Sequence, residues 1–249
     1  MFARIWLGLK VFFCYLLPFL PCCPKIGELE DGDCIFVQSF GRNSIPDKDL
    51  GKTIWEILHK SKSLSEALTF LRYSGFDPGK PNRALAKKAI RLSKKFKIPI
   101  IAQWEVIFVI WESERKWFLD NQAEIDCLWP PELGYYATFH VKLECREKMR
   151  ARGKSRPIEV CHPAMVARAI PVIWKTGVNV VIEAVHFWSF FKGELWVWDE
   201  DSVQPWTRAF VRLKDPREWW LSRESFGRFV HHLLKGWVSF IPVYVPVTI

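Results

Sequence analysis

Between residues 156 and 183 the spacing of hydrophobic positions changes from that of a strand to that of a helix and back to that of a strand. This pattern predicts a β-α-β unit. Ile158 to Cys161 form a short strand-like run. Pro163 suits a first helical turn, and the apolar residues after it follow helical spacing up to Gly177. Residues 178–182 are a nearly continuous β-branched run, typical of a strand buried on both faces. Such a unit implies a right-handed crossover within a parallel sheet.

The same patterns predict the other elements of an α/β fold with a mostly parallel sheet. Two more strands are expected at 34–40 and 98–101, and Ser63-x-x-Glu66 is a capping box that opens a helix. Asn82 is expected to be the N-cap of a basic helix that extends to Lys97. Further helices are expected at 47–60 and 134–152, whereas 106–111 fits a helix or a strand and 112–133 is mixed.

The two ends of the chain are more apolar than its middle. Residues 11–23 form an apolar run preceded by Arg4 and Lys10, shorter than the roughly 20 residues of a spanning helix. This run fits a membrane anchor or an arm packed on the domain. We expect a hydrophobic segment at 1–30, an α/β domain at 31–240 and an apolar tail at 241–249.

Composition narrows the classes of function only a little. The 249 residues are 49% hydrophobic and 25% charged, which is ordinary for a globular protein. The net charge is +9, and part of it lies on the helix at 82–97, as a solvated face or a surface for anionic partners. Nothing resembles a nucleic-acid-binding motif. Seven cysteines without a CxxC pair argue for reduced thiols and against a zinc site.

Polar residues that follow the predicted strands are the candidate site, because ligands of parallel sheets bind beyond the carboxyl ends of the strands. Arginines and a helix N-terminus suit a phosphate, a pyrophosphate or a carboxylate. Glu105 and His162 would form an acid/base pair if the protein is an enzyme. The alternatives are a salt bridge for Glu105 and a capping or core role for His162. The candidate ligand-binding residues are Ser39, Gly41, Arg42, Asn82, Gln103, Arg168, Gln204, Trp206 and Arg208.

An ordered set of short motifs resembles the YdcF-like domain family of bacteria. The motifs are Gln38-Ser39-Phe40-Gly41-Arg42, Asp77-Pro78-Gly79-x-x-Asn82-x-Ala84, residues 99–105, Cys161-His162-Pro163-x-x-x-x-Arg168, and residues 202–208 with Arg217-Glu218. The resemblance spans residues 33–230. It implies a Rossmann-like three-layer fold with a ligand cleft at the strand ends, and some relatives are membrane-anchored and linked to cell-envelope upkeep. Here Met165 stands where the family pattern has a histidine, and Cys161-His162 stands where it has Thr-Ser.

The sequence therefore predicts a protein that binds a small anionic ligand, nucleotide- or phosphate-bearing, as an enzyme or as a binding protein of the cell envelope. The alternative is a non-enzymatic protein docked on a membrane surface by its apolar ends and basic helix. A third hypothesis is a metal-dependent hydrolase that uses Asp199, Glu200 and Asp201. The expected location is a bacterial membrane surface or the cytoplasm, and the residues identify no cofactor.

Overall fold

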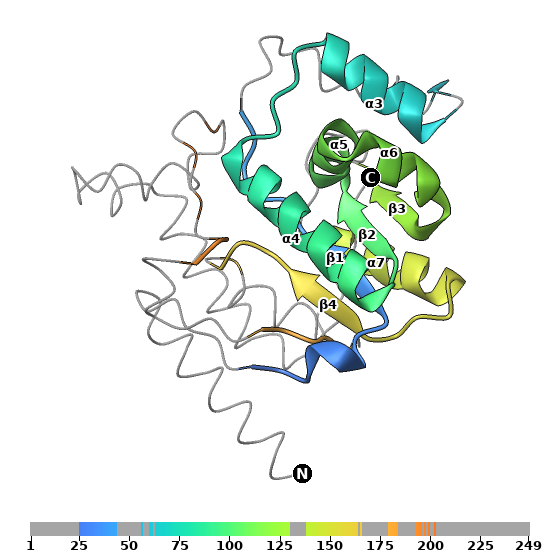
Figure 1. Ribbon diagram of the computed structural model, residues 1–249, viewed down its shortest axis with the longest axis vertical. Helices are drawn as coiled ribbons and strands as arrows, with labels where there is room; N and C mark the ends of the chain where they lie inside the picture. The colour runs from blue at the N-terminus through green and yellow to red at the C-terminus, as the bar shows by residue number, and fades with distance from the viewer. Residues whose placement is uncertain are drawn as a thin grey trace, which may run out of the picture.

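Four parallel strands form the centre of the protein, in the order β3-β2-β1-β4 (Figure 1). The strands are β1 (Cys34–Val37), β2 (Ile100–Gln103), β3 (Ile125–Leu128) and β4 (Pro157–Val160). This computed structural model describes residues 25–43, 56, 60–61, 63–129, 138–163, 165, 179–183, 193–195, 197, 199 and 202. The predicted α/β class with a parallel sheet is confirmed.

The strand order contains a reversal between β1 and β4. The chain adds β2 and β3 on one side of β1 and then returns to place β4 on the other side. Beyond β4, Val181 forms a parallel bridge with Ile158, so the chain continues outward on that side. This is the arrangement predicted from residues 156–183, although the helix between its two strands lies largely outside the described residues. In open α/β sheets the point of reversal, at the carboxyl ends of the strands, is where ligands bind.

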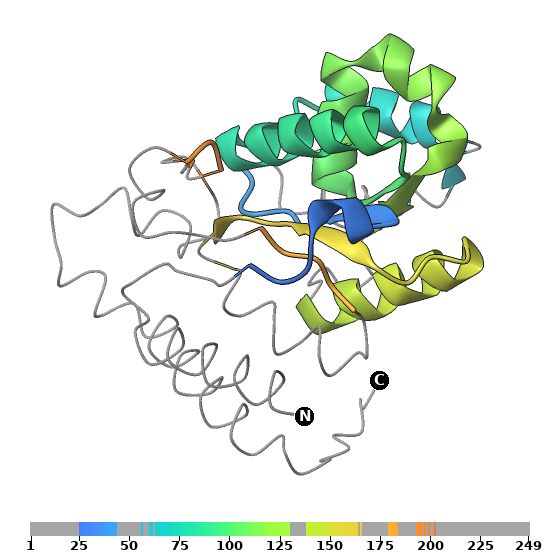
Figure 2. The same ribbon diagram turned by 60° about the horizontal axis from the view of Figure 1, so that its bottom comes forward.

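Helices cover both faces of the sheet, which gives three layers (Figure 2). One face carries α3 (Leu64–Tyr73), α4 (Lys80–Phe96), α5 (Trp104–Ser113) and α6 (Arg115–Asp120), and the other carries α7 (Thr138–Ala151). The side chains of β1 alternate between the two layers. Ile35 and Val37 pack in the core below α4 and α5, whereas Cys34 and Phe36 pack with residues of α7. The period of two in a strand therefore builds two separate hydrophobic cores.

Local sequence signals explain most element boundaries. Ser63 accepts a hydrogen bond from the Glu66 N–H (3.2 Å) and caps α3, as the capping box predicts. Residues 106–111, which fitted a helix or a strand, are helical and belong to α5. The prediction that Asn82 caps the basic helix is wrong. The cap lies three residues earlier, at Gly79, so that helix α4 begins at Lys80 with Pro81 in its first turn.

Several expectations concern residues that lie outside the described part of the chain. They are the apolar segment before residue 25, the tail at 241–249 and most of the helix expected at 47–60. Within the described residues, none of the helices is long and apolar enough to span a bilayer.

Candidate functional site

The segments that follow β1 and β4 meet at the point of reversal in the sheet. Residues 38–43, which we call the β1 loop, leave the carboxyl end of β1, and His162 follows the end of β4. The rings of Phe40 and His162 stack at 3.8 Å between centroids and 7° between planes. Both residues are buried. The crevice that the strand order predicts is therefore bordered by two segments in direct contact.

Side chains from two other elements hold the β1 loop in place. Gln103 is the last residue of β2 and also the N-cap of α5, and its Oε1 accepts a hydrogen bond from the Ser39 N–H (2.9 Å). From the first turn of α4, Asn82 accepts from the Phe40 N–H (2.9 Å) and donates to the Gly41 carbonyl (2.6 Å). Gly41 has φ +69°, a conformation in which a side chain would be strained. The β1 loop is thus held by hydrogen bonds to side chains of β2 and α4, which lie far from it in the sequence.

We expect Asn82→Ala to destabilise the protein by about 2–3 kcal/mol, because three backbone groups lose their partner. Besides its two bonds to the β1 loop, Asn82 donates to the Pro78 carbonyl (2.7 Å), and its side chain is fully buried. Chemical denaturation measures the loss. Asn121→Ala is the matched control, since that amide makes one bond, to the Trp117 carbonyl (2.8 Å), and should cost about 1 kcal/mol. Equal losses in the two variants would contradict the role of Asn82.

A segment from late in the chain also contacts the β1 loop and the start of α4. Ser202 donates to the Arg42 carbonyl (3.2 Å) and forms a bridge with Asn43. Three residues earlier, Asp199 accepts a hydrogen bond from the Lys80 N–H (2.8 Å) at the start of α4. The positive end of α4 is thus already occupied by a buried carboxylate of the protein itself. The positive partner of an anionic ligand must therefore be a group other than the N-terminus of α4.

The position of Asp199 also bears on the hypothesis of a metal-dependent hydrolase. Asp199 is almost fully buried and serves as a helix cap, whereas Glu200 and Asp201 lie outside the described residues. No cluster of three or more His, Cys, Asp or Glu side chains suited to a metal occurs in the described part of the chain.

Glu105 is the buried carboxyl group of the crevice. It lies in the first turn of α5, only 8% exposed, and its Oε2 makes no hydrogen bond with any described residue. Burial raises the pKa of Glu105, while the charge of Arg42 and a hydrogen bond with the Ser39 side chain lower it in part. The Arg42 guanidinium is half-buried and lies 5.9 Å from the centre of the Trp104 ring. Ser39, Arg42 and Glu105, which we call the Glu105 cluster, thus combine a hydroxyl, a cation and an acid.

His162 has a different environment from Glu105. Its side chain is fully buried, and burial lowers its pKa to about 3, partly offset by a hydrogen bond to the Val197 backbone. The imidazole is therefore neutral near pH 7. Its contacts are with Phe40 and Val197, whereas those of Glu105 are with Ser39 and Arg42. The alternative of a core histidine fits this burial, and the acid/base role of His162 stays a prediction.

Of the predicted site residues, seven gather around the carboxyl ends of β1, β2 and β4. They are Ser39, Gly41, Arg42, Asn82, Gln103, Glu105 and His162. The other four lie outside the described residues: Arg168, Gln204, Trp206 and Arg208. Sequence reasoning missed the stacking of Phe40 on His162, because an aromatic residue directly after a strand is too common to be singled out. It considered Asp199 as a metal ligand and missed its hydrogen bond to the start of α4.

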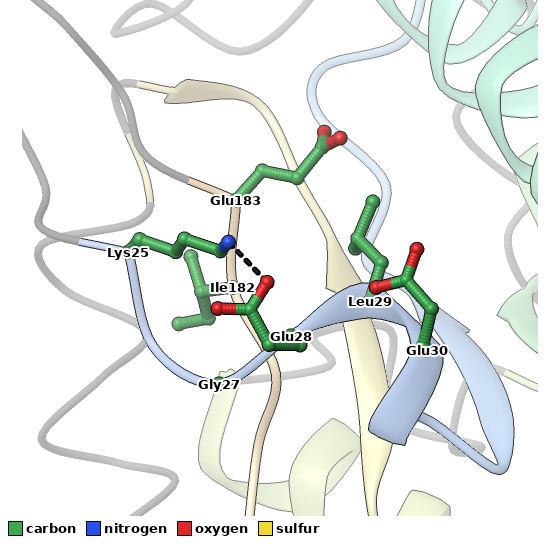
Figure 3. Close-up of a pocket in the computed structure, with 7 residues that line it drawn as sticks. All are labelled: Lys25, Gly27, Glu28, Leu29, Glu30, Ile182 and Glu183. Atoms are coloured by element: carbon green, nitrogen blue, oxygen red, sulfur yellow. Dashed lines mark hydrogen bonds and ion pairs between the residues drawn. The ribbon is translucent and has the colours of Figure 1, made fainter.

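A separate cavity of about 480 Å³ lies near the start of the described chain (Figure 3). Its lining consists of Lys25, Gly27, Glu28, Leu29, Glu30, Ile182 and Glu183. Lys25 forms an ion pair with Glu28, and Glu183 forms one with Lys88 of α4. The cavity volume thus indicates one place for a ligand, and the convergent polar groups after β1 and β2 indicate another. The carboxyl ends of β1, β2 and β4 remain the candidate site, because convergent polar groups and a buried acid with a raised pKa lie there.

Comparisons with protein-family models, with curated proteins and with solved structures find no match to this chain. The resemblance to the YdcF-like family therefore stays a prediction, and the case for the site rests on the geometry around β1, β2 and β4.

Proposed function

We propose that this protein binds a small anionic ligand, nucleotide- or phosphate-bearing, in the crevice at the carboxyl ends of β1 and β4. The observation that carries the proposal is the convergence of Ser39 and Arg42 of the β1 loop with Glu105 of α5, at the point where the strand order reverses. Such convergence of polar groups from separate elements is typical of binding sites.

Arg42 is the proposed partner of the anion. Its guanidinium is half-buried, so it is partly desolvated and still open to a ligand, and its backbone carbonyl is held by Ser202. A guanidinium binds phosphate or carboxylate oxygens through two parallel hydrogen bonds. Since Asp199 already caps α4, the helix N-terminus considered from the sequence is a weaker anion partner than Arg42.

We expect Arg42→Ala to weaken the binding of phosphate-bearing probes about 10- to 100-fold, because a charge-assisted hydrogen bond is lost. The probes are ATP, AMP, ribose 5-phosphate and inorganic phosphate, tested by thermal shift and by titration calorimetry on the full chain. Arg150→Ala is the matched control, since it removes the same charge from an exposed position near the end of α7. If no probe binds the wild type, or if both variants bind equally well, the proposal fails.

The alternative, docking on an anionic membrane surface, receives little support from the basic helix. Arg83 of α4 pairs with Glu112 (2.9 Å), Arg91 with Glu194 (2.6 Å) and Lys94 with Glu114 (3.2 Å). Lys88 is mostly buried against Glu183. Carboxylates of the same chain thus neutralise much of the charge that the alternative needs. A role in the cell envelope rests only on the family resemblance and stays a prediction.

A further inference from the structure

We infer that Arg91 of α4 is a positioning residue for Arg42. It acts through an ion pair with Glu194 and through residues 194–202, which we call the late segment. This role goes beyond the proposed function, because it assigns a task to the basic helix and to a distant part of the chain. It rests on the proposed function only for its consequence, the binding of an anion by Arg42.

The ion pair between Arg91 and Glu194 differs from an ordinary surface pair. Two parallel hydrogen bonds join the side chains, from Nη1 to Oε2 (2.9 Å) and from Nη2 to Oε1 (2.6 Å). The Nζ of Lys88 lies 3.3 Å from the same Oε1 and also pairs with Glu183. Single exposed pairs contribute little, but bidentate geometry and networks of charges are the exceptions. The hydrogen bond with Arg91 holds the pKa of Glu194 below its ordinary value, so the pair is charged at neutral pH.

The late segment leads from this ion pair to the start of α4. Leu195, the residue after Glu194, packs against the hydrophobic core. Asp199 accepts a hydrogen bond from the Lys80 N–H (2.8 Å), and its carbonyl accepts another from the Ser202 N–H (3.3 Å). Asp199 and Ser202 are therefore held together and attached to the first residue of α4.

The connection from Glu194 to Asp199 is short. A stretch of five residues spans at most about 18 Å. Over the same interval, from Lys80 to Arg91, α4 rises by about 16 Å. A displacement of Glu194 from α4 is therefore passed on to Asp199 and Ser202, because no long loop lies between them to absorb it.

Ser202 holds the end of the β1 loop that carries Arg42. Its hydroxyl donates to the Arg42 carbonyl (3.2 Å), and its backbone forms a bridge with Asn43. Asp77 also bonds to Asn43, and side chains of β2 and α4 hold residues 39–41. The backbone from which the Arg42 guanidinium extends is thus held by the late segment.

The test compares charge reversal at two positions of α4 in the full chain, with ATP as the probe in titration calorimetry. Arg91→Glu should weaken ATP binding about 5- to 10-fold, because two carboxylates then repel each other and release the late segment. Lys94→Glu is the matched control, since it changes the charge of the same helix equally and its partner, Glu114 (3.2 Å), is not in the late segment. It should change the affinity by less than about twofold. Adding Glu194→Arg to Arg91→Glu should restore part of the lost affinity.

Ser202→Ala distinguishes positioning from a general loss of stability. It removes the contact with Arg42 and leaves the ion pair intact, so it should weaken ATP binding by a similar factor. In the Ser202→Ala background, Arg91→Glu should have little further effect, because both changes act on Arg42 through the same contact. Independent losses would instead multiply. The Arg91 and Glu194 side chains are 54% and 45% exposed, so reversing their charges should leave the core folded.

Hydrogen exchange measured by mass spectrometry tests the same coupling without a ligand. Arg91→Glu should speed the exchange of backbone amides in the β1 loop, and Lys94→Glu should not. Equal exchange in the two variants, or an Arg91→Glu protein that binds ATP as tightly as the wild type or more tightly, would overturn the role of Arg91. If the wild type binds none of the four phosphate probes but loop exchange depends on Arg91, the proposed function fails and the positioning role stands.

Discussion

Lys142→Met should destabilise the protein by about 3–5 kcal/mol at pH 7, because it leaves a buried carboxylate without its partner. Lys142 of α7 and Glu159 of β4 form an ion pair in which the side chains are 3% and 1% exposed. The ammonium also lies 4.0 Å from the centre of the Phe36 ring. Burial raises the pKa of Glu159, and Lys142 lowers it in part. Urea denaturation of the wild type and the variant measures the loss.

Two further variants show whether the loss comes from the pair. Lys116→Met is the matched control, since Lys116 pairs with Asp120 on the surface, where such pairs contribute about 0–1 kcal/mol. Lys142→Met combined with Glu159→Met removes both charges and should recover most of the stability. The cost of the single variant should shrink as the pH falls from 7 to 5, because burial raises the pKa of Glu159 and loss of Lys142 raises it further, so that the unpaired carboxylate takes up a proton. A loss that is the same at pH 7 and pH 5 would rule out this explanation.

The central part of the fold follows from local patterns. The apolar runs at 34–40, 98–101 and 158–161 predicted three of the four strands, and the capping box at Ser63 predicted the start of α3. Strand β3 was missed because Ile125-Asp126-Cys127-Leu128 is short and has an acid in its middle. Asp126 is stabilised there by an ion pair with Arg152, which follows α7. Nothing in the sequence of the strand predicts that partner.

The sequence predicted which residues lie at the strand ends, but not which of them hold the β1 loop in place. Strand ends identified Ser39, Arg42 and Glu105, because the ends of parallel strands must lie at one edge of the sheet. The position of Asn82 within α4 was misjudged, since Gly79-Lys80-Pro81 can also start a helix. Its two bonds to the β1 loop join residues that are 42 and 41 positions apart in the sequence. Contacts at that distance depend on the tertiary structure, which propensities and spacing do not encode.

The stability of the wild type should fall relative to that of His162→Asn by about 3–4 kcal/mol between pH 7 and pH 4. Burial holds the pKa of His162 at about 3, below its value of 6.5 in an unfolded chain. The stabilisation is therefore complete above pH 6.5 and is lost as the pH falls toward 3, because only the unfolded state binds the proton. Asn cannot titrate and keeps a hydrogen-bond donor for Val197.

The measurement is the free energy of unfolding of both proteins at half-unit steps of pH. Buried acids such as Glu105 and Glu159, with raised pKa values, act in the opposite direction. They are present in both proteins, so the difference between the two curves isolates His162. Parallel curves would mean that His162 has the same pKa in the folded and the unfolded protein, which would contradict the effect of its burial. A diverging pair of curves would instead leave Glu105 as the acid/base group of the crevice near neutral pH.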